Sequence, residues 1–537
     1  MHDPPMGEFL WVDFFLFSSL SRSIANSRPF PAMNRFLLKA TLPKPFAGRY
    51  YLRPVAQRLA RHYSSDAAPG ADVYDLVIIG GGPAGLTLAT ALKNSPVTRN
   101  LKTILVEGSD ISPIKKWEPD MEYFENRVSS LTPRSVRFLE KIGAWNHIHQ
   151  ERVQSYDDMR VWDGVSDARI EFAPFINEES GDTWEIAHMV ENKNLQFSML
   201  SRLAELNNAL PEGVMPTEIL DKSRVKAITT GEKPSTDGAL DLSGWPVVEL
   251  EDGRKLTTRL LVGADGANSP ARSFAGIEAR GWDYNRFGLV GTVRLEYEDF
   301  RTVAFQRFLK TGPIAMLPMP NGFASLVWSC TPEMAKVLKG LPGDVFTVLV
   351  NAAFRLGPVD IDYIFKHMLT RPDGVTAAEL QDELDWRLEN TPLVDEDNNY
   401  PIYVETVQEG SRAAFPLKMK HADTYVADRV ALVGDAAHTT HPLAGQGLNM
   451  GQQDVESLVG ALEVAATRGL DIGSLLAIEP YWADRYFANH LKLGVVDKLH
   501  KIYSTDWEPV VQLRSFGLNL INNLDFVKRE LMKQASN

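Results

Sequence analysis

Three glycine-rich segments of this chain carry residue types that could bind a phosphate-containing ligand. The first, Gly80-Gly81-Gly82-Pro83-Ala84-Gly85, follows an apolar, β-branched run at residues 73–79. Its spacing is typical of a dinucleotide-binding turn, in which Gly80 permits the tight turn, Gly82 lets the backbone approach a pyrophosphate, and Gly85 lets helix and strand pack closely. The segment therefore predicts a buried strand, a phosphate-binding turn and a helix.

The residues after this turn predict which nucleotide it takes. Residues 86–92 form a plausible helix whose N-terminal amides and dipole would face an anion. Residues 102–106 predict the next strand, which ends at Glu107, where an acid that binds ribose hydroxyls is expected. Glu107 favours a free ribose 2′-hydroxyl and would repel a 2′-phosphate. The site therefore suits FAD or NAD and not NADP, and a glycine-rich turn without a ligand is the alternative.

A second segment reads Gly434-Asp435-Ala436-Ala437-His438 and continues through a turn rich in glycine to Gly445-Gln446-Gly447-Leu448-Asn449. Residues 429–433 predict a short strand that ends at Gly434-Asp435. A helix is expected from about residue 448 through 465. Its N-terminal amides and dipole would stabilise negative charge, such as that of a reduced flavin ring.

The third segment lies between the other two and is weaker alone. Asp252-Gly253 predicts a hairpin turn and residues 260–264 a buried strand, followed by Asp265-Gly266 with Ser269 and Arg272. In this order, the three segments resemble the class A flavoprotein monooxygenases, the single-component FAD hydroxylases. The resemblance extends from about Val73 over most of the chain, and it implies FAD as the cofactor.

The resemblance also implies roles for single residues. Asp435 would bind ribityl hydroxyls, the amides of Leu448 and Asn449 would meet the pyrimidine edge of the flavin, and Arg127 would lie beside the isoalloxazine. The Pro442 turn would lie over the flavin, with Pro442 and His441 in backbone or orienting roles in catalysis. Arg127 as a surface cation and His441 as a buried hydrogen-bonding residue remain alternatives. The expected cofactor-binding residues are Gly80, Gly82, Gly85, Glu107, Arg127, Asp265, Gly266, Asp435, Gly445, Gly447, Leu448 and Asn449.

Several other segments are similar to the ubiquinone-biosynthesis branch of these hydroxylases, and to its mitochondrial members in particular. They include Met159-Arg160-Val161-Trp162-Asp163, Met189-Val190-Glu191-Asn192, Gln306-Arg307-Phe308 and the run at residues 312–318. The similarity implies hydroxylation of ring carbon 5 of a polyprenylated 4-hydroxybenzoate by O2 through a flavin C4a-hydroperoxide. Another FAD enzyme of the same fold, an epoxidase or prenyl reductase acting on a different lipid, and a non-catalytic prenyl-binding relative are the alternatives.

The similarity implies partners as well. It implies other ubiquinone-biosynthesis proteins in a complex, and a ferredoxin with its reductase as electron donor, where most relatives take hydride from NADPH. A basic cluster at Arg412, Lys418, Lys420 and His421 is the best candidate surface for an acidic ferredoxin, with a solvated basic loop as the alternative.

The N-terminal region has the composition of a mitochondrial transit segment. Residues 34–65 contain no acid and seven basic side chains, Arg35, Lys39, Lys44, Arg49, Arg53, Arg58 and Arg61. Cleavage is expected after Tyr63, and Met33 is expected to be the functional start. The predicted location is the mitochondrial matrix, peripheral on the inner membrane.

Composition is that of a large enzyme and excludes several classes. The chain has 537 residues, 44% of them hydrophobic, and its only cysteine is Cys330, so no disulfide framework or zinc site is expected. The eleven histidines show no metal-ligand spacing. The net charge is −13, and residues 1–63 contribute nine basic and three acidic side chains, so the remainder carries −19. Such acidity argues against a nucleic-acid partner.

The predicted fold is an α/β FAD-binding domain, Rossmann-like and of the 4-hydroxybenzoate hydroxylase type, with an antiparallel-sheet substrate domain and C-terminal helices. After the leader and presequence (1–63), the FAD domain takes 72–155, 190–215, 255–280 and 410–480. The substrate domain takes 156–189, 216–254 and 281–409, with an insertion near 356–400 that contains a charged helix at 377–388. In the C-terminal helices (481–537), an amphipathic stretch at 510–532 is expected to pack its apolar face as core rather than against a membrane; that face is Val510, Leu513, Phe516 and Leu520.

Overall fold

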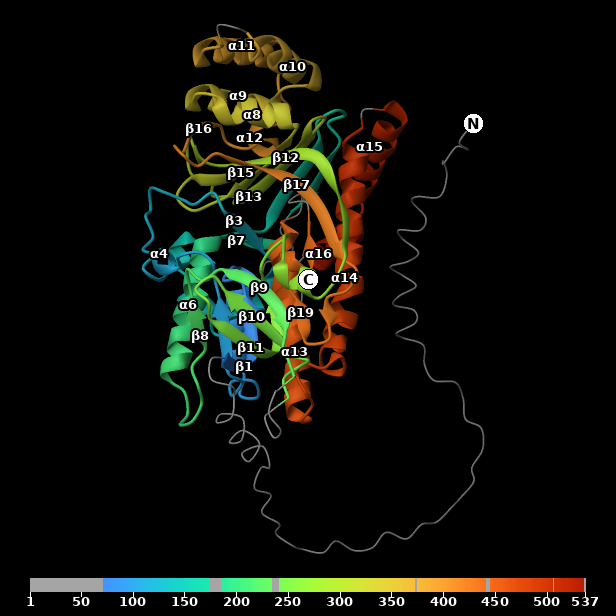
Figure 1. Cartoon of the computed structure of the whole chain (residues 1–537). Coiled ribbons are helices and arrows are strands. Elements are labelled where there is room, and N and C mark those ends of the chain that lie inside the picture. The colour runs from blue at the N-terminus through green and yellow to red at the C-terminus, as the bar shows by residue number, and fades with distance from the viewer. Residues whose placement is uncertain are drawn as a thin grey trace, which may run out of the picture. The chain divides into compact units, whose positions relative to one another are not determined.

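The structure is a computed structural model that describes residues 71–173, 185–233, 241–371, 374–440, 445–505 and 507–535. Its first sheet has the strand order β18-β19-β11-β1-β2-β8 (Figure 1). Strand β1 pairs in parallel with β2 and β11, and β11 pairs in parallel with β19. The apolar runs of the sequence therefore form buried parallel strands, as predicted. The bounds are β1 (Ala71–Ile79), β2 (Thr103–Val106), β8 (Glu218–Leu220), β11 (Lys255–Gly263), β18 (Val426–Ala427) and β19 (Val430–Leu432).

A hairpin extends this sheet and corrects one predicted boundary. Strands β9 (Val225–Thr230) and β10 (Pro246–Leu250) pair with each other, and β10 pairs antiparallel with β11. The turn between β10 and β11 contains Gly253 at φ +88°, as the Asp252-Gly253 hairpin predicts. Residues 216–254 were expected in the substrate domain, but the short hairpin forces β10 beside β11 and therefore into the first sheet.

Helices cover the first sheet. Helix α3 (Pro83–Asn94) packs between α6 (Asn192–Asn208) and α13 (Gln446–Thr467), and α13 packs on α14 (Leu475–Tyr503). The expected boundary after residue 480 therefore falls inside α14, because the helix begins before it. A small sheet has the order β3-β7-β4, with α5 packed on β3, while α4 packs on α6. These elements are α4 (Ser112–Lys115), α5 (Pro133–Lys141), β3 (Val128–Leu131), β4 (Gln154–Tyr156) and β7 (Ala187–Glu191).

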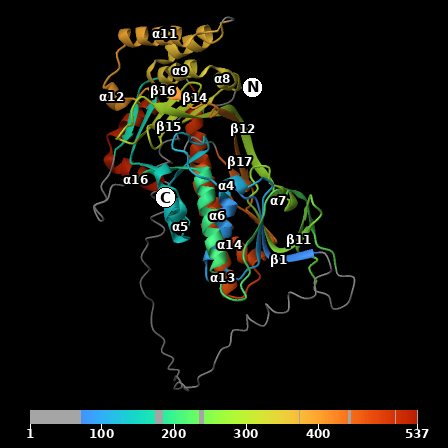
Figure 2. The same ribbon diagram turned by 90° about the vertical axis from the view of Figure 1, so that its left-hand side faces the viewer.

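The second large sheet is mainly antiparallel, as predicted, and has the order β20-β17-β12-β15-β14-β13-β5-β6, with β16 beside β12. Figures 1 and 2 show it between the helices α8 and α9 and the part of the chain that carries β1 and β11. Its strands are β5 (Asp158–Asp163), β6 (Arg169–Phe172), β12 (Ala279–Leu295), β13 (Val303–Leu309), β14 (Gly312–Pro318), β15 (Phe323–Cys330), β16 (Val404–Val407), β17 (Ala413–Ala422) and β20 (His438–Thr439).

The two faces of this second sheet differ, as strand alternation requires. One face packs Leu289, Phe305, Ile314, Leu326 and their neighbours against α8 (Pro332–Gly340) and α9 (Gly343–Arg355). The residues between them in sequence point to the other face, toward the first sheet. Part of this second face packs on β4 and β7, and other residues of it, such as Ala315 and Val327, are only half-buried.

The predicted insertion forms helices that pack outside α9. They are α10 (Pro358–Tyr363), a π-helical turn (Ile364–Met368), α11 (Ala377–Asn390) and α12 (Glu396–Asn399). Helix α11 begins at a capping box in which Thr376 and Glu379 bond each other's backbone amides. The charged helix expected at 377–388 is thus present.

The chain ends in α15 (Glu508–Asn522) and α16 (Asp525–Ala535). Helix α15 packs against β6 of the second sheet. In the described part of the chain, no helix combines the length and the hydropathy needed to cross a lipid bilayer.

Candidate cofactor site

The parallel strands bring the three glycine-rich segments to one sheet edge. Ile79 is in register with Val106 on one side and Gly263 on the other, and Gly263 is in register with Leu432. Backbone bonds continue this alignment past the strand ends, from Ala264 N to the Ile79 carbonyl (2.8 Å). Because carboxyl ends of parallel strands form the ligand-binding edge of such sheets, residues 80, 107, 265 and 435 follow four neighbouring strands at one site.

The first turn has the steric form that a bound pyrophosphate needs. Gly80 has φ +109°, and a Cβ there would lie 2.2 Å from the Ala264 carbonyl oxygen. A Cβ on Gly85 would lie 1.9 Å from the Gly80 carbonyl oxygen. Beside Gly82, in contrast, no atom lies within 4 Å of the Cβ position. The first and third glycines are therefore needed for close packing, while the second faces open space that a phosphate can occupy.

Glu107 is held against this turn. Its carboxylate accepts hydrogen bonds from the amides of Gly81 (2.6 Å) and Ser109 (2.6 Å). Each oxygen keeps a second lone pair for a ligand hydroxyl. The acid thus lies where a ribose would follow the pyrophosphate, and its contact with the ribose stays a prediction.

The middle segment joins the other two. Asp265 Oδ2 accepts from the Ala271 amide (3.1 Å), while Oδ1 is buried without a hydrogen-bond partner in the described chain, and this burial raises the pKa of the carboxyl. Gly266 follows at φ +81°. The Arg272 guanidinium donates to the carbonyls of Ala267 (2.7 Å) and Ala436 (2.8 Å). Arg272, at the start of α7 (Pro270–Phe274), therefore ties this segment to the one that carries Asp435.

Asp435 is the acid most clearly free to bind a ligand. Its side chain is accessible from solvent and has no hydrogen-bond partner among the described residues. Protein atoms surround it on most sides, and this desolvation raises the pKa of its carboxyl, against the opposing effect of His438. An unpartnered carboxylate at the strand edge fits the ribityl hydroxyls of FAD.

Helix α13 begins two residues earlier than predicted, at Gln446, after Gly445 at φ +59°. The first three amides of the helix therefore have no acceptor within it; they belong to Gln446, Gly447 and Leu448. The Asn449 amide, in contrast, lies four residues after Gly445, whose carbonyl is its helical acceptor. Leu448 is half-buried. The predicted catalytic residues His441 and Pro442 lie outside the described residues.

The Asn449 side chain is fully buried and fixes the start of α13 against β3 and α5. Its Nδ2 donates to the carbonyls of Ser130 (2.7 Å) and Gly445 (3.2 Å). Its Oδ1 accepts from the Thr132 amide (2.9 Å) and the Ser135 hydroxyl (2.8 Å). The side chain is therefore used within the protein, and a flavin contact of Asn449 could come only from its backbone.

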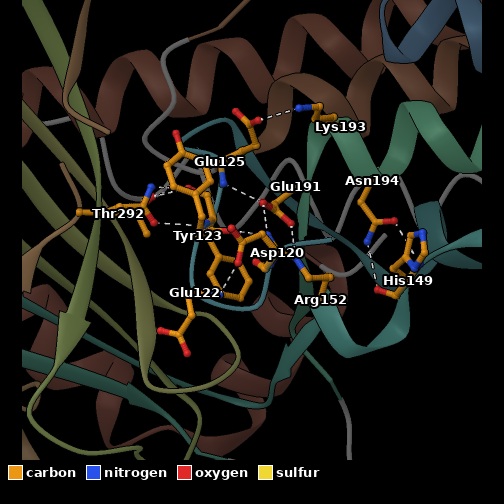
Figure 3. A network of polar contacts seen from close by, with 12 residues as sticks. Asp120, Glu122, Tyr123, Glu125, His149, Arg152, Glu191, Lys193, Asn194 and Thr292 are labelled. Carbon is orange, nitrogen blue, oxygen red and sulfur yellow. Dashed lines mark hydrogen bonds and ion pairs between the residues drawn. The ribbon is translucent and has the colours of Figure 1, made fainter. Parts of the chain in front are cut away.

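Arg127 lies just before β3, is exposed, and forms no ion pair with a described residue. The loop that leads to it is anchored by an ion pair that sequence reasoning missed (Figure 3). Arg152 Nη2 and Nε donate to the two oxygens of Glu191 (2.6 and 2.8 Å), and both side chains are buried. Arg152 also donates to the carbonyls of Asp120 and Tyr123, so it connects the loop to Glu191 at the end of β7.

A second buried network, also missed, holds the Asp435 turn. Asp454, on α13, accepts from the Gly434 amide (3.1 Å) and lies 2.5 Å from His438 Nε2. Arg485 and Asn489 of α14 donate to its other oxygen (3.3 and 2.9 Å). Although burial opposes it, contact with His438 and Arg485 holds the pKa of Asp454 below its usual value. The only signal in the sequence is an acid within an otherwise buried helix, and it gives no hint of these partners.

The basic cluster proposed for ferredoxin does not form one surface. Arg412 donates to the Leu338 carbonyl (3.0 Å) and lies over the Phe346 ring. His421 is buried, and desolvation together with His438 and His490 lowers its pKa to about 4, so it is neutral. Only Lys418 and Lys420 remain, and Lys418 is paired with Asp283 (3.4 Å). Alternation along β17 places His421 on the opposite face from Lys418 and Lys420, and Arg412 lies before the strand begins.

The face of the second sheet opposite α8 and α9 has a short row of half-buried apolar side chains. Val290, Val327 and Ala315 are in register across β12, β15 and β14, and all three are half-buried. Gln306 of β13 continues the row and is buried. Small aliphatic side chains in a row can hold an aromatic ring or a prenyl chain without offering a nucleophile.

A parallel sheet whose carboxyl edge can bind FAD, combined with a second, mainly antiparallel sheet, is the arrangement of the FAD-dependent monooxygenases. The sequence matches the FAD binding domain family over residues 73–339 and 394–475. These matched segments leave out most of the predicted insertion. The probable FAD-dependent monooxygenase pqsL of Pseudomonas aeruginosa has a similar fold (TM-score 0.57, 20% identity, 83% of this chain and 99% of that one). The p-nitrophenol 4-monooxygenase PnpA of Pseudomonas putida does too (TM-score 0.58, 16% identity, 87% and 99%).

Full-length relatives narrow the class further. The chain is 45% identical over 484 residues to the mitochondrial ubiquinone biosynthesis monooxygenase COQ6 of Saccharomyces cerevisiae, covering 88% of this chain and 96% of that protein. It is 35% identical over 472 residues to the human protein of the same description, covering 86% and 92%. The chain belongs to the family of FAD-dependent ubiquinone biosynthesis monooxygenases.

Proposed function

We propose that this protein hydroxylates ring carbon 5 of a polyprenylated 4-hydroxybenzoate, with FAD as cofactor and O2 as the oxygen source. The convergence of Gly82, Glu107 and Asp435 on one strand edge, beneath an apolar sheet face, carries the proposal. When bound, FAD supplies the chemistry that activates O2 and delivers one oxygen atom to the ring. The protein binds the cofactor, orients the ring and excludes water.

Each task has candidate residues in this chain. Asp435 would accept hydrogen bonds from ribityl hydroxyls, and Glu107 from a ribose. The unpaired amides at the start of α13 would stabilise negative charge on the flavin ring. Val290, Val327 and Ala315 would hold the substrate ring, with the prenyl chain along the same sheet face.

The activity is tested with purified protein, FAD, a reducing system and a short-chain prenylated 4-hydroxybenzoate under labelled O2. The expected product gains one labelled oxygen at carbon 5. A gain of two hydrogens in the chain, or an epoxide, would instead assign the protein to the prenyl reductases or epoxidases. Val327→Phe should lower kcat/KM for the prenylated substrate, and Trp386→Phe on α11 is the control.

We also propose a ferredoxin system as electron donor. The family relationship supports it, whereas the dispersed cluster around Lys418 leaves only a small basic surface for it. Anaerobic reduction of the flavin, followed by absorbance, separates the donors. Rapid, substrate-stimulated bleaching by NADPH alone would overturn the ferredoxin proposal, and reduction only with ferredoxin would support it.

The proposed location is the mitochondrial matrix, after cleavage following Tyr63. The relatives described as mitochondrial and the acid-free basic segment support this. N-terminal sequencing of the native protein is the test. A mature protein that retains the basic segment would contradict the proposal.

A further inference from the structure

Helix α15 has two apolar faces, and the structure covers only one of them. Val511 and Leu518 are buried, whereas Leu513, Phe516 and Leu520 on the opposite side are 50%, 66% and 48% exposed. These three residues were predicted as packed core. The prediction was wrong because periodicity identifies an apolar face but not what covers it. The face that does pack contains Arg514, a charged residue that no hydrophobic pattern selects.

The buried side of α15 fixes the orientation of the helix. Arg514 donates to both oxygens of Asp163 at the end of β5 (2.7 and 3.0 Å), and both side chains are buried. The same guanidinium donates to the carbonyls of Ile502 and Thr505 (2.9 and 2.8 Å). Leu518 packs with Phe308 and Ile170 of the second sheet. Turning the exposed face inward would separate Arg514 from Asp163 and leave a buried charge without its partner. The face therefore stays exposed to solvent.

Two more large apolar side chains are exposed near the ends of α15. Trp507, directly before α15, is 65% exposed, and Phe526, in the first turn of α16, is 71% exposed. Aromatic residues on exposed helical segments are typical of surfaces that contact another apolar phase. We call Leu513, Phe516 and Leu520 the α15 face.

Charge favours a bilayer over another protein as the partner. Residues 490–537 carry seven basic and five acidic side chains, whereas the remainder from residue 64 carries −21. The C-terminal helices are therefore the part of an acidic protein that an anionic surface can approach with least repulsion. Since no described helix can cross a bilayer, contact would be interfacial.

We propose that the α15 face inserts into the surface of an anionic lipid bilayer. The proposal deepens the proposed function, because a polyprenylated substrate partitions into the apolar phase of a membrane. The inner side of the same helix packs on the sheet that would hold the substrate ring. Membrane contact would consequently place that sheet next to the bilayer in which the polyprenylated substrate dissolves.

The test is flotation of the full-length holoprotein with phosphatidylcholine vesicles that contain ~20 mol% cardiolipin, or none. The wild type should float with the anionic vesicles. Combined Leu513→Ser, Phe516→Ser and Leu520→Ser should lower the bound fraction about tenfold or more. The control, Val359→Ser with Trp386→Ser and Val394→Ser, removes three apolar side chains of the insertion that are exposed at least as much on average and should float like the wild type. Flotation needs no turnover, so its result is independent of whether the proposed reaction occurs.

A labelled variant tests the same face without disturbing it broadly. Because Cys330, the only cysteine of the sequence, is buried, Phe516→Cys can be labelled selectively with an environment-sensitive dye. Its emission should shift to shorter wavelength on addition of anionic vesicles. The proposal is overturned if the wild type does not float, if the α15 triple variant floats unchanged, or if that variant instead converts a dimer to a monomer in light scattering.

Discussion

At the scale of single residues, Asp435 carries the sharpest expectation. Asp435→Ala removes a carboxylate that has no hydrogen-bond partner among the described residues and that the ribityl hydroxyls would engage, so FAD affinity should fall about 10–100-fold. The measurement is the flavin content and the FAD Kd of the purified variant. Asp428→Ala, an exposed acid just before β19, is the matched control and should bind FAD normally. Full flavin content in Asp435→Ala would show that the cofactor does not use this edge.

Asp454 stabilises the turn that carries Asp435, because it accepts a hydrogen bond from the Gly434 backbone amide. Asp454→Asn leaves His438 and Arg485 with an uncharged partner in a buried site, and we expect a loss of about 3–5 kcal/mol in the free energy of unfolding. FAD binding should weaken with it, since Gly434 loses its carboxylate acceptor. Chemical denaturation and FAD titration measure the two effects. Asp484→Asn, on the exposed side of α14, should change neither; equal stability of both variants would refute the anchoring role.

His421 predicts a dependence on pH. Its pKa of about 4 in the folded protein lies below the unfolded value near 6.5, so between these values the unfolded chain binds more protons. Stability contributed by the neutral ring should therefore be complete above pH ~6.5 and lost as pH falls toward ~4. His421→Gln should make the acid-side loss shallower in denaturation measured across this window. If the slope of the free energy of unfolding against pH is unchanged in His421→Gln, other titrating groups determine the loss of stability in acid.

At the scale of elements, the Arg152–Glu191 pair should decide whether the loop before Arg127 is ordered. Arg152→Ala leaves Glu191 buried and unpaired, which should cost about 3–5 kcal/mol and expose residues 116–127 to protease. Limited proteolysis with mass mapping locates the cut. Arg134→Ala breaks a partly exposed pair with Glu456 and should cost less than ~1 kcal/mol, without new cleavage in this loop. Cleavage elsewhere in Arg152→Ala would contradict the assignment.

The elements also show what the sequence could and could not reveal. Strands β1, β2, β11 and β19 and the helix α11 were predicted because apolar runs, a charged helical run and fixed glycine positions are local signals. Residues 216–254 were assigned to the substrate domain, although the predicted hairpin at Asp252-Gly253 places β10 beside β11 in the first sheet. Distance along the chain hid the contacts of Asp454 and Arg152, whose partners lie 16 to 39 positions away and leave no local pattern. The exposed face of α15 was misread because amphipathicity gives no information about the neighbour.

At the scale of the whole molecule, the cofactor site is assembled from segments that begin near residue 80 and end near residue 449. A ligand that binds the folded chain alone therefore stabilises all of these segments together, rather than one element. At a FAD concentration about a hundred times its Kd, the gain is ~2.7 kcal/mol, which raises Tm by ~3 °C for a domain of this size. Removal of FAD should lower Tm by that amount in a single transition that also loses the flavin signal.

The variants test this coupling between the site and the fold. Asp435→Ala should have the Tm of the FAD-free wild type when FAD is absent. With FAD added, its Tm should rise by at most about half of the wild-type gain, because its fold is intact but its FAD affinity is about 10–100-fold lower. Asp454→Asn should melt below the Tm of the FAD-free wild type, because it loses the anchor of the turn as well. Calorimetry of the wild type and both variants, each with and without FAD, gives the comparison. A FAD-dependent rise in Tm confined to one of two separate transitions would show that the glycine turn and the Asp435 segment belong to independently folding parts.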